Sequence, residues 1–439
     1  MSDRTPITAP SIVRLAPLLA LAGCGALSGL FGNIGGIGGG QTQVFPRRVA
    51  WQGAPITTAA TSVVRPVAVV AVDINLDGLV DVVAAFEGSM VQPPSVDLFL
   101  QSRSGGQLTW PRVTIGQGPN LAGVSAVAVG DVNLDGRADV VAACNARIVY
   151  LRSPQDPTAA LQWQSSTIAQ SDAAGLGRWR DVAIAQVDNL FGPDIVACNE
   201  SPGLLSFFQA PMLANDGFGW VRFDIDGQTR AGAAALLLSD LNGDGRPDII
   251  SSAPGEANAR IAWYRHPGGT TIGMFTGTFS RFVIGNERGV ARLALGDLNR
   301  DGRADLVCVN SSEPSAADAG DGRRIGWYER PADPTASWVG HVLARFTANT
   351  PTDAAVADVD VNGNPDVIVS TRQAGTLRWF TRRDDVRQTW IENNLADLNA
   401  GAVRLAPADI DLDARPDVIA ALSGDNGSAD GLGWFLNPE

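Results

Sequence analysis

Short apolar runs alternate with polar turns along most of the chain, and an acidic nine-residue segment recurs between two such runs. At one occurrence the run 126–129 precedes the acidic segment, and the run 140–143 follows it. Apolar runs of this length, bounded by Asp, Asn and Gly, are typical of β-strands joined by turns. Each acidic segment is therefore predicted to connect the first and second strands of one sheet.

The acidic segment occurs seven times at a nearly constant spacing. Its first positions are Asp73, Asp131, Gln186, Asp240, Asp297, Asp358 and Asp409. A nearly fixed period, here averaging about 56 residues, is the sequence signature of a repeat architecture. Each period is therefore predicted to form one structural unit.

Aromatic residues in each period predict a third and a fourth strand. The third strand carries paired aromatics, as at 261–264 and 325–328. The fourth strand is headed by Trp110, Trp163, Trp220, Phe279, Trp338 and Trp390 in successive periods. Recurrence at one position in every unit favours packing between sheets, although an aromatic stripe can also stack against bases or sugars. Seven units of four antiparallel strands predict an all-β fold, namely a seven-bladed β-propeller of four-stranded blades.

The seventh unit predicts how the ring closes. It ends after its third strand, so the sequence supplies no fourth strand at that end. Trp51 precedes Asp73 at an interval similar to that between the other fourth-strand aromatics and their following loops, but no earlier unit contains it. We expect residues 47–56 to complete the last blade.

Composition excludes several chemistries. The chain is 45% hydrophobic and has 33 basic residues, all of which are Arg, so lysine Schiff-base chemistry is absent. With two His in the chain, a His-rich zinc site is excluded. The net charge of −13 argues against nucleic-acid binding, because such binding needs a basic face. The cysteines after position 24, at 144, 198 and 308, follow apolar runs and are expected to be buried and unpaired.

Residues 1–42 differ in character from the rest of the chain. Arg4 and Arg14 precede an apolar stretch at 15–22, which is the layout of a secretory signal. Residues 21–24, Leu-Ala-Gly-Cys, resemble a bacterial lipobox, in which the cysteine is lipidated and becomes the mature N-terminus. The resemblance implies a signal peptide at 1–23 and a lipid on Cys24.

These features predict a domain order and a location. A Gly-rich flexible tether is expected at 24–42, followed by the propeller at 43–439. A lipid on Cys24 implies an exported protein that is anchored to the bacterial cell envelope, compatible with the outer membrane. Contact with the membrane is then expected only through that lipid. Without lipidation, the mature protein would be soluble or secreted.

The acidic segments have the chemistry of a calcium loop. Their pattern Asp-x-Asn/Asp-x-Asp/Asn-Gly-x-x-Asp places oxygen ligands at positions 1, 3, 5 and 9, and calcium takes 6 to 8 oxygens. Glycine at position 6 permits the sharp turn. Position 12 is Ala84, Ala142 or Ser251 where an EF-hand has Glu, so an EF-hand is excluded. Tight Asp/Asn/Gly turns also form without metal, but five full matches in register favour a cation.

With this motif, the chain resembles the FG-GAP/VCBS-type repeat proteins over residues 43–439. These have integrin-alpha-like seven-bladed propellers with calcium in the loop between the first two strands. The resemblance implies these ligands: Asp73, Asn75, Asp77 and Asp81; Asp131, Asn133, Asp135 and Asp139; Asp240, Asn242, Asp244 and Asp248; Asp297, Asn299, Asp301 and Asp305; Asp358, Asp360, Asn362 and Asp366; and Asp409, Asp411, Asp413 and Asp417.

The expected cofactor is therefore structural Ca²⁺ at five to six sites. The sixth depends on Ala414, which replaces the usual glycine. The third unit has Gln186, Leu190 and Phe191 at positions 1, 5 and 6, so we expect it to bind no metal. Six Ca²⁺ would change the formal net charge from −13 to −1, which accounts for most of the acidity.

A ligand site is expected on the face opposite the calcium loops, where the connections are longer and less regular. Charged residues occur where four of the innermost strands begin, at Asp181, Arg292, Asp353 and Arg404. We expect them to surround the mouth of the central channel. The alternative is a set of solvated ion pairs.

Three functions remain open. The family resemblance implies a binding or adhesion module for an unidentified protein or carbohydrate. A polysaccharide-acting, lyase-like enzyme would need Tyr, His and Arg to converge in a cleft, and the chain has three Tyr and two His. We assign no catalytic residue and expect no enzyme activity. A purely structural envelope protein would lack a concave polar site.

Overall fold

The computed structural model describes residues 51–57, 65–104, 107–170, 177–226, 230–258, 260–268, 275, 277–312, 322–372, 375–382, 387, 389–398, 401–423 and 430–438. The predicted signal peptide, the predicted lipidation site at Cys24 and the predicted Gly-rich tether lie outside these residues. In the described part, no helix is long and apolar enough to cross a membrane.

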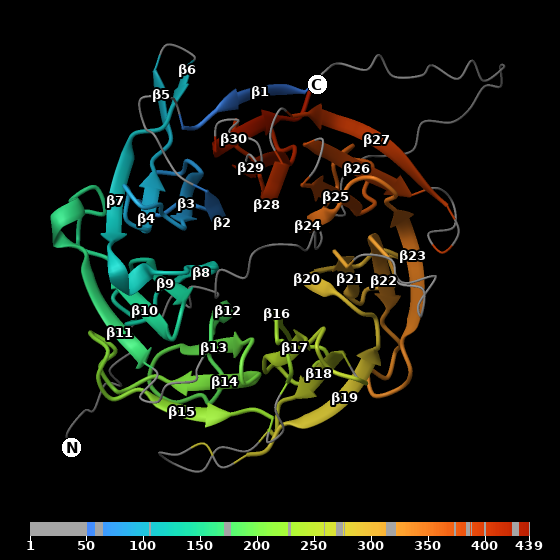
Figure 1. The fold of residues 1–439 in the computed structure, drawn as a ribbon, viewed down its shortest axis with the longest axis horizontal. Coiled ribbons are helices and arrows are strands. Elements are labelled where there is room, and N and C mark those ends of the chain that lie inside the picture. Colours follow the sequence, from blue (N-terminus) through green and yellow to red (C-terminus); the bar gives the residue numbers. More distant parts are fainter. Residues whose placement is uncertain are drawn as a thin grey trace, which may run out of the picture.

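Seven four-stranded antiparallel sheets surround a central axis as blades (Figure 1). Blade one contains β2 (Pro66–Val72), β3 (Asp81–Phe86), β4 (Ser95–Phe99) and β7 (Arg112–Gln117). Blade two contains β8 (Ala126–Gly130), β9 (Asp139–Cys144), β10 (Arg147–Arg152) and β11 (Gln164–Gln170). Blade three contains β12 (Trp179–Ala185), β13 (Asp194–Asn199), β14 (Leu204–Gln209) and β15 (Val221–Asp224). Blade four contains β16 (Ala235–Ser239), β17 (Asp248–Ser252), β18 (Ile261–Arg265) and β19 (Ser280–Gly285).

The remaining blades follow the same order. Blade five contains β20 (Val290–Gly296), β21 (Asp305–Asn310), β22 (Arg324–Glu329) and β23 (Val339–Arg345). Blade six contains β24 (Pro351–Ala357), β25 (Asp366–Thr371), β26 (Thr376–Arg382) and β27 (Trp390–Asp397). Blade seven contains β28 (Gly401–Ala408), β29 (Asp417–Ser423), β30 (Gly431–Leu436) and β1 (Gln52–Pro55). The predicted all-β, seven-bladed propeller is confirmed.

Small elements outside the blade pattern were not predicted. A hairpin of β5 (Ser102–Ser104) and β6 (Gln107–Thr109) lies between the third and fourth strands of blade one. Two short 3-10 helices, η2 (Pro119–Leu121) and η3 (Ala160–Gln162), flank the fourth strands of blades one and two.

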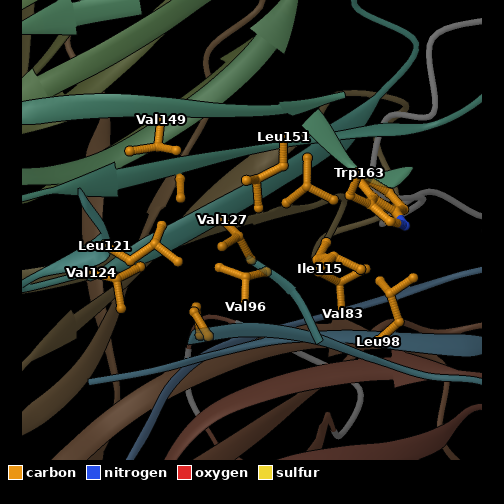
Figure 2. Packing of buried hydrophobic residues seen from close by; sticks show 14 of the residues in the cluster. Val83, Val96, Leu98, Ile115, Leu121, Val124, Val127, Val149, Leu151 and Trp163 are labelled. Carbon is orange, nitrogen blue, oxygen red and sulfur yellow. The ribbon is translucent and has the colours of Figure 1, made fainter. Parts of the chain in front are cut away.

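The core consists of separate apolar layers, several of which lie between neighbouring blades. In one layer, Val83 and Leu98 of blade one pack with Val127 and Val149 of blade two (Figure 2). The second strands are buried at nearly every position, because both of their faces contact a neighbouring blade. The fourth-strand aromatics are packed as predicted, and Trp163 is 8% exposed at the edge of the same layer.

The N-terminal strand closes the ring. β1 pairs with β30 in antiparallel register, with Gly53 opposite Phe435. Just beyond β1, the N–H of Ile56 donates to the carbonyl of Leu432 at 2.8 Å. The Ile56 side chain is buried in a layer that joins blade seven to blade one. The first blade and the last are therefore held together by a strand from the opposite end of the chain.

Candidate metal centres and the channel mouth

The acidic loops connect the first and second strands of their blades, and the position-1 carboxylate organises each predicted metal loop. In blade two, Asp131 accepts hydrogen bonds from the N–H of Asp135 at 3.0 Å and of Gly136 at 2.8 Å. The same two bonds recur in blades one, four, five, six and seven. Gly136 has φ of +85°, a conformation that costs glycine little.

The blade-seven loop keeps this geometry without glycine. Ala414 donates its N–H to Asp409 at 2.9 Å and has φ of +69°. A left-handed alanine costs roughly 1–2 kcal/mol relative to its usual conformation. Alanine in place of glycine at position 6 therefore strains the blade-seven loop but does not change the path of its backbone.

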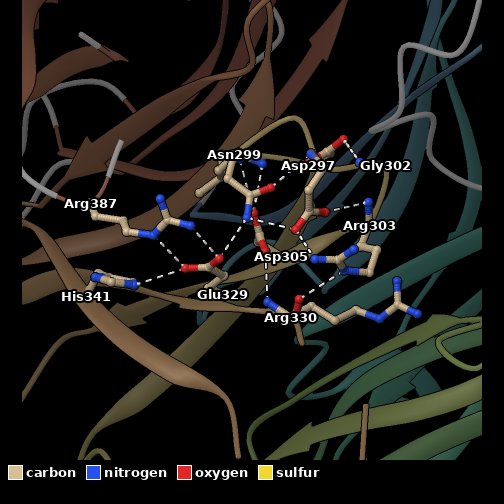
Figure 3. A network of polar contacts seen from close by, with 11 residues as sticks. Asp297, Asn299, Gly302, Arg303, Asp305, Glu329, Arg330, His341 and Arg387 are labelled. Atoms are coloured by element: carbon tan, nitrogen blue, oxygen red, sulfur yellow. Dashed lines mark hydrogen bonds and ion pairs between the residues drawn. The ribbon is translucent and has the colours of Figure 1, made fainter. Parts of the chain in front are cut away.

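The position-9 carboxylate is a fixed, fully buried feature of every blade. It is occupied by Asp81, Asp139, Asp194, Asp248, Asp305, Asp366 and Asp417, each 0% exposed. One oxygen accepts the N–H of the residue at position 2 in all seven blades. The other accepts an N–H from just beyond the third strand in six of them. Blade five shows this arrangement around Asp305 (Figure 3).

Burial raises the pKa of all seven position-9 carboxyls. The pKa is about 6 for Asp81, Asp248 and Asp417, and about 7 for Asp139, Asp194, Asp305 and Asp366. Burial is the largest cause in each case, and a nearby loop carboxylate adds to the increase. A cation at the loop would favour the charged form.

The loops of blades six and seven bring three carboxylates together. Oxygens of Asp358, Asp360 and Asp366 lie within 4.8 Å of one another, and so do oxygens of Asp409, Asp411 and Asp413. Buried oxygens of Asp366 and Asp411 have no hydrogen-bond partner in the described structure. These hard oxygen donors fit Ca²⁺.

The loops of blades one, two, four and five have a different local arrangement. In each, the Asn amide at position 3 donates to the position-5 carboxylate at 3.0 Å. Among the described residues, their three Asp do not meet as closely as those of blades six and seven. Rotation of that Asn amide would turn its oxygen, in place of its nitrogen, toward the position-5 carboxylate. The ligand types still fit Ca²⁺ in these four blades.

The blade-three loop is closed by side-chain amides. Gln186 donates its amide to the carbonyls of Leu190 at 3.0 Å and Gly192 at 3.1 Å. The amide of Gln209 donates to Asp188, which is also buried. Amide donors therefore occupy the loop that the sequence predicts to be metal-free.

Blade five has a further carboxylate that the motif did not identify. Glu329, at the end of β22, accepts from the Asn299 amide at 3.2 Å and from Arg387 at 2.9 Å (Figure 3). The hydrogen bond from Arg387 lowers the pKa of Glu329. Because Glu329 lies on the third strand of the blade, far along the chain from the acidic loop, no local pattern connects the two.

On the opposite face, a cavity of about 400 Å³ lies where the inner strands begin. Its charged wall residues are Arg65, Arg178, Arg180, Arg292, Arg372, Arg404 and Glu87. We refer to this cavity as the arginine basin. Arg292 and Arg404 were expected at this mouth, whereas Arg65 and Arg372 were missed because they lie outside the position used for the prediction.

Asp181 and Asp353 do not belong to the basin wall. Asp181 accepts the N–H of Leu236 at 3.0 Å, and Asp353 accepts the N–H of Leu405 at 3.0 Å. Each therefore ties its inner strand to the inner strand of the next blade. The expectation of a ring of four charged residues at the mouth must be corrected, because these two carboxylates are used in contacts between blades.

A second cavity, of about 300 Å³, contains Arg324, Tyr328 and His341 together with Glu287. Arg324 forms an ion pair with Glu287 at 2.9 Å. Burial and the Glu287 charge raise the pKa of the Tyr328 phenol, so it keeps its proton at neutral pH.

The polar contacts of this second cavity recur in blade four. There Tyr264 donates to Asp226 at 2.8 Å, and Arg281 forms an ion pair with the same carboxylate. The recurrence of Tyr, carboxylate and Arg in adjacent blades favours a structural contact between blades.

Comparison with known proteins agrees with the repeat. A family model described as an FG-GAP-like repeat matches residues 73–142 and 240–308. The chain is therefore a seven-bladed β-propeller in which two segments match the FG-GAP-like repeat. No curated protein matches it.

Two solved structures are similar to the chain. One is an Agrocybe aegerita lectin that recognises non-reducing terminal N-acetylglucosamine; it is 15% identical, with 78% of this chain and 83% of that chain covered and a TM-score of 0.46. The other is a protein from Lactobacillus plantarum, 10% identical, with coverages of 75% and 84% and a TM-score of 0.47.

We predict that Asp194→Asn destabilises the chain and that the loss is larger at low pH. An Asn amide cannot accept the N–H groups of both Val187 and Ala210, which costs on the order of 1–3 kcal/mol. The folded-state pKa of about 7 exceeds the ordinary value of 3.8. The stability that Asp194 contributes is thus complete below about pH 4 and is lost as the pH rises through 7.

Urea midpoints of the metal-stripped full chain at pH 5.5 and pH 8 measure this effect. The difference between wild type and Asp194→Asn should shrink at pH 8. The control is Asp224→Asn in the same blade, at a side chain that is 41% exposed, which should show no such trend. A difference that stays constant or grows with pH contradicts the prediction.

Proposed function

We propose that this chain is a calcium-stabilised, surface-tethered propeller that acts as a binding or adhesion module for a protein or a glycan. The observation that carries this proposal is the separation of two faces. Regular acidic loops lie on one face, and an open, charged cavity lies on the other. Loops on a rigid scaffold are where binding residues are usually found.

Calcium would have a structural role in this proposal. The loop ligands would be the position-1, 3, 5 and 9 side chains of six blades, and a bound cation would neutralise carboxylates whose charge burial disfavours. A ligand that binds only the folded loops stabilises the folded state by mass action. The metal would therefore hold the scaffold on which the other face depends.

We expect five or six bound Ca²⁺ per chain, and chelation should lower the thermal midpoint by more than about 10 °C. Asp131→Ala should remove one equivalent, because Asp131 is the position-1 ligand of blade two. Gln186→Ala, the same position in blade three, should remove none. Equilibrium dialysis with metal counting and thermal unfolding provide the measurements. No bound calcium and an unchanged midpoint would reopen the acidic face as a surface for a basic partner.

A non-catalytic role is favoured by the residues in the two cavities. The arginine basin contains neither Tyr nor His, and all five such residues of the chain lie elsewhere in the described structure. The cluster at Tyr328 resembles a contact between blades that also occurs at Tyr264. A lyase-like enzyme remains the alternative, and its base would have to come from another residue type.

Arrays of immobilised glycans and proteins test the binding function. The full chain with Cys24→Ser, loaded with calcium, should bind at least one class of ligand. Ala291→Trp, which fills part of the basin wall, should weaken that binding at least about tenfold. Leu134→Trp, at a 62% exposed position in the blade-two metal loop, should leave it unchanged. Binding that Leu134→Trp abolishes, or no binding at all, would contradict the proposal and favour a purely structural protein.

The location in the cell envelope is proposed from the lipobox at residues 21–24. A lipid on Cys24 would hold the folded domain at a membrane through the Gly-rich segment. Labelled palmitate should enter the wild-type chain but not Cys24→Ser when both are expressed in a bacterium that processes lipoproteins. Equal labelling of the two would exclude Cys24 as the anchor.

A further inference from the structure

The arginine basin carries more positive charge than its wall neutralises. Six of its seven charged wall residues are Arg, and the seventh, Glu87, forms an ion pair with Arg65 at 3.4 Å. Glu200, near the rim, forms an ion pair with Arg180 at 3.6 Å. These two pairs leave four guanidinium groups around one cavity, in a chain whose net charge is −13.

The contacts of these four groups leave donors available. Arg178 donates to the carbonyls of Gly123 and Val124, and Arg404 to those of Val403 and Ser125. Each guanidinium has five N–H donors, so each retains several. Arg372 is exposed, and its side chain has no polar contact with the described residues.

Arg292 of β20 is a partly buried arginine of the basin wall. It donates to the carbonyls of Ala234 and Ala291, and its buried Nε has no partner in the described structure. Asp181 and Asp353 are close enough to act on Arg292 electrostatically, but they accept backbone N–H groups of neighbouring strands. These two carboxylates reduce the net charge around Arg292 but do not line the basin.

The wall also indicates what kind of anion would fit. Its apolar residues are small, namely Pro66, Val67, Ala291 and Val403, and it contains no aromatic ring. A peptide would usually be anchored by apolar side chains in matching pockets, and such pockets are absent from this wall. The volume of about 400 Å³ is in the range of small-ligand sites. A compact ligand with a polar surface on all sides is favoured.

We propose that the arginine basin binds the acidic units of a saccharide through their carboxylate or sulfate groups. The guanidinium fork matches the geometry of these oxyanions, and clustering of like charges before binding makes an anion more favourable there. This inference rests on the proposed binding function and specifies its ligand class. Wall residues of the basin lie on or next to the inner strands β2, β12, β20, β24 and β28, and these strands surround the axis (Figure 1).

Calorimetric titration of the calcium-loaded full chain tests the proposal, with digalacturonate as the probe. A neutral galactose disaccharide and a Glu-Glu dipeptide serve as comparisons. Digalacturonate should bind at least about tenfold more tightly than either, and its Kd should rise with added NaCl. Equal affinity for the neutral disaccharide overturns the anion site. Equal affinity for the dipeptide overturns the saccharide assignment.

Charge-matched variants locate the site. Arg180→Gln/Arg372→Gln removes two basin charges and should weaken digalacturonate binding at least about tenfold. Arg147→Gln/Arg222→Gln removes two charges outside the basin and should change Kd less than about twofold. Thermal midpoints in calcium establish that both proteins are folded. Equal losses in the two variants overturn the assignment.

The array result separates this inference from the proposed function. If Ala291→Trp abolishes capture of a ligand that Arg180→Gln/Arg372→Gln still binds normally, the binding module stands and the acidic-saccharide site is overturned. If no arrayed ligand binds but digalacturonate binds in the basin, the anion site stands and the adhesion role fails.

Discussion

The hydrogen bonds of one buried carboxylate organise every blade of this propeller. The position-9 Asp is the first residue of the second strand. Its carboxylate accepts a hydrogen bond from a backbone N–H of the preceding loop and, in six blades, one from a backbone N–H just beyond the third strand. A fully buried carboxyl group is costly unless its oxygens are hydrogen-bonded. In those six blades the fold therefore places three segments around the carboxylate, and in all seven the loop donates a backbone N–H to it.

The blade without a metal motif separates the two roles of the acidic loop. Blade three has lost the ligand types at positions 1 and 5 but keeps Asp194, with both of its oxygens used by backbone N–H groups. The Asp at position 9 is thus needed to accept hydrogen bonds from the backbone, whereas the side chains at positions 1, 3 and 5 supply the oxygen ligands that suit a cation. In blade three, Gln186 supplies donors to loop carbonyls and closes the turn by itself.

Charge is divided between the faces of the disc in opposite senses. Carboxylates cluster in the loops after the innermost strands, while six arginines line the cavity where those strands begin. The net charge of −13 describes the sum and conceals this division. Strand direction alternates within each blade, so equivalent connections of all the blades lie on the same face. A charge pattern that repeats along the sequence therefore becomes a difference in charge between the two faces.

The sequence by itself determined the repeat, the strand order, the blade number and the N-terminal closure, because each rests on a local pattern that every unit repeats. It also identified the loop carboxylates as a set. Only the tertiary structure decided that Asp181 and Asp353 serve contacts between blades, and that Arg65, Arg178 and Arg372 meet around one cavity. Residues from blades that are far apart in the chain meet at the propeller axis, and their distances depend on ring closure, which no local pattern encodes.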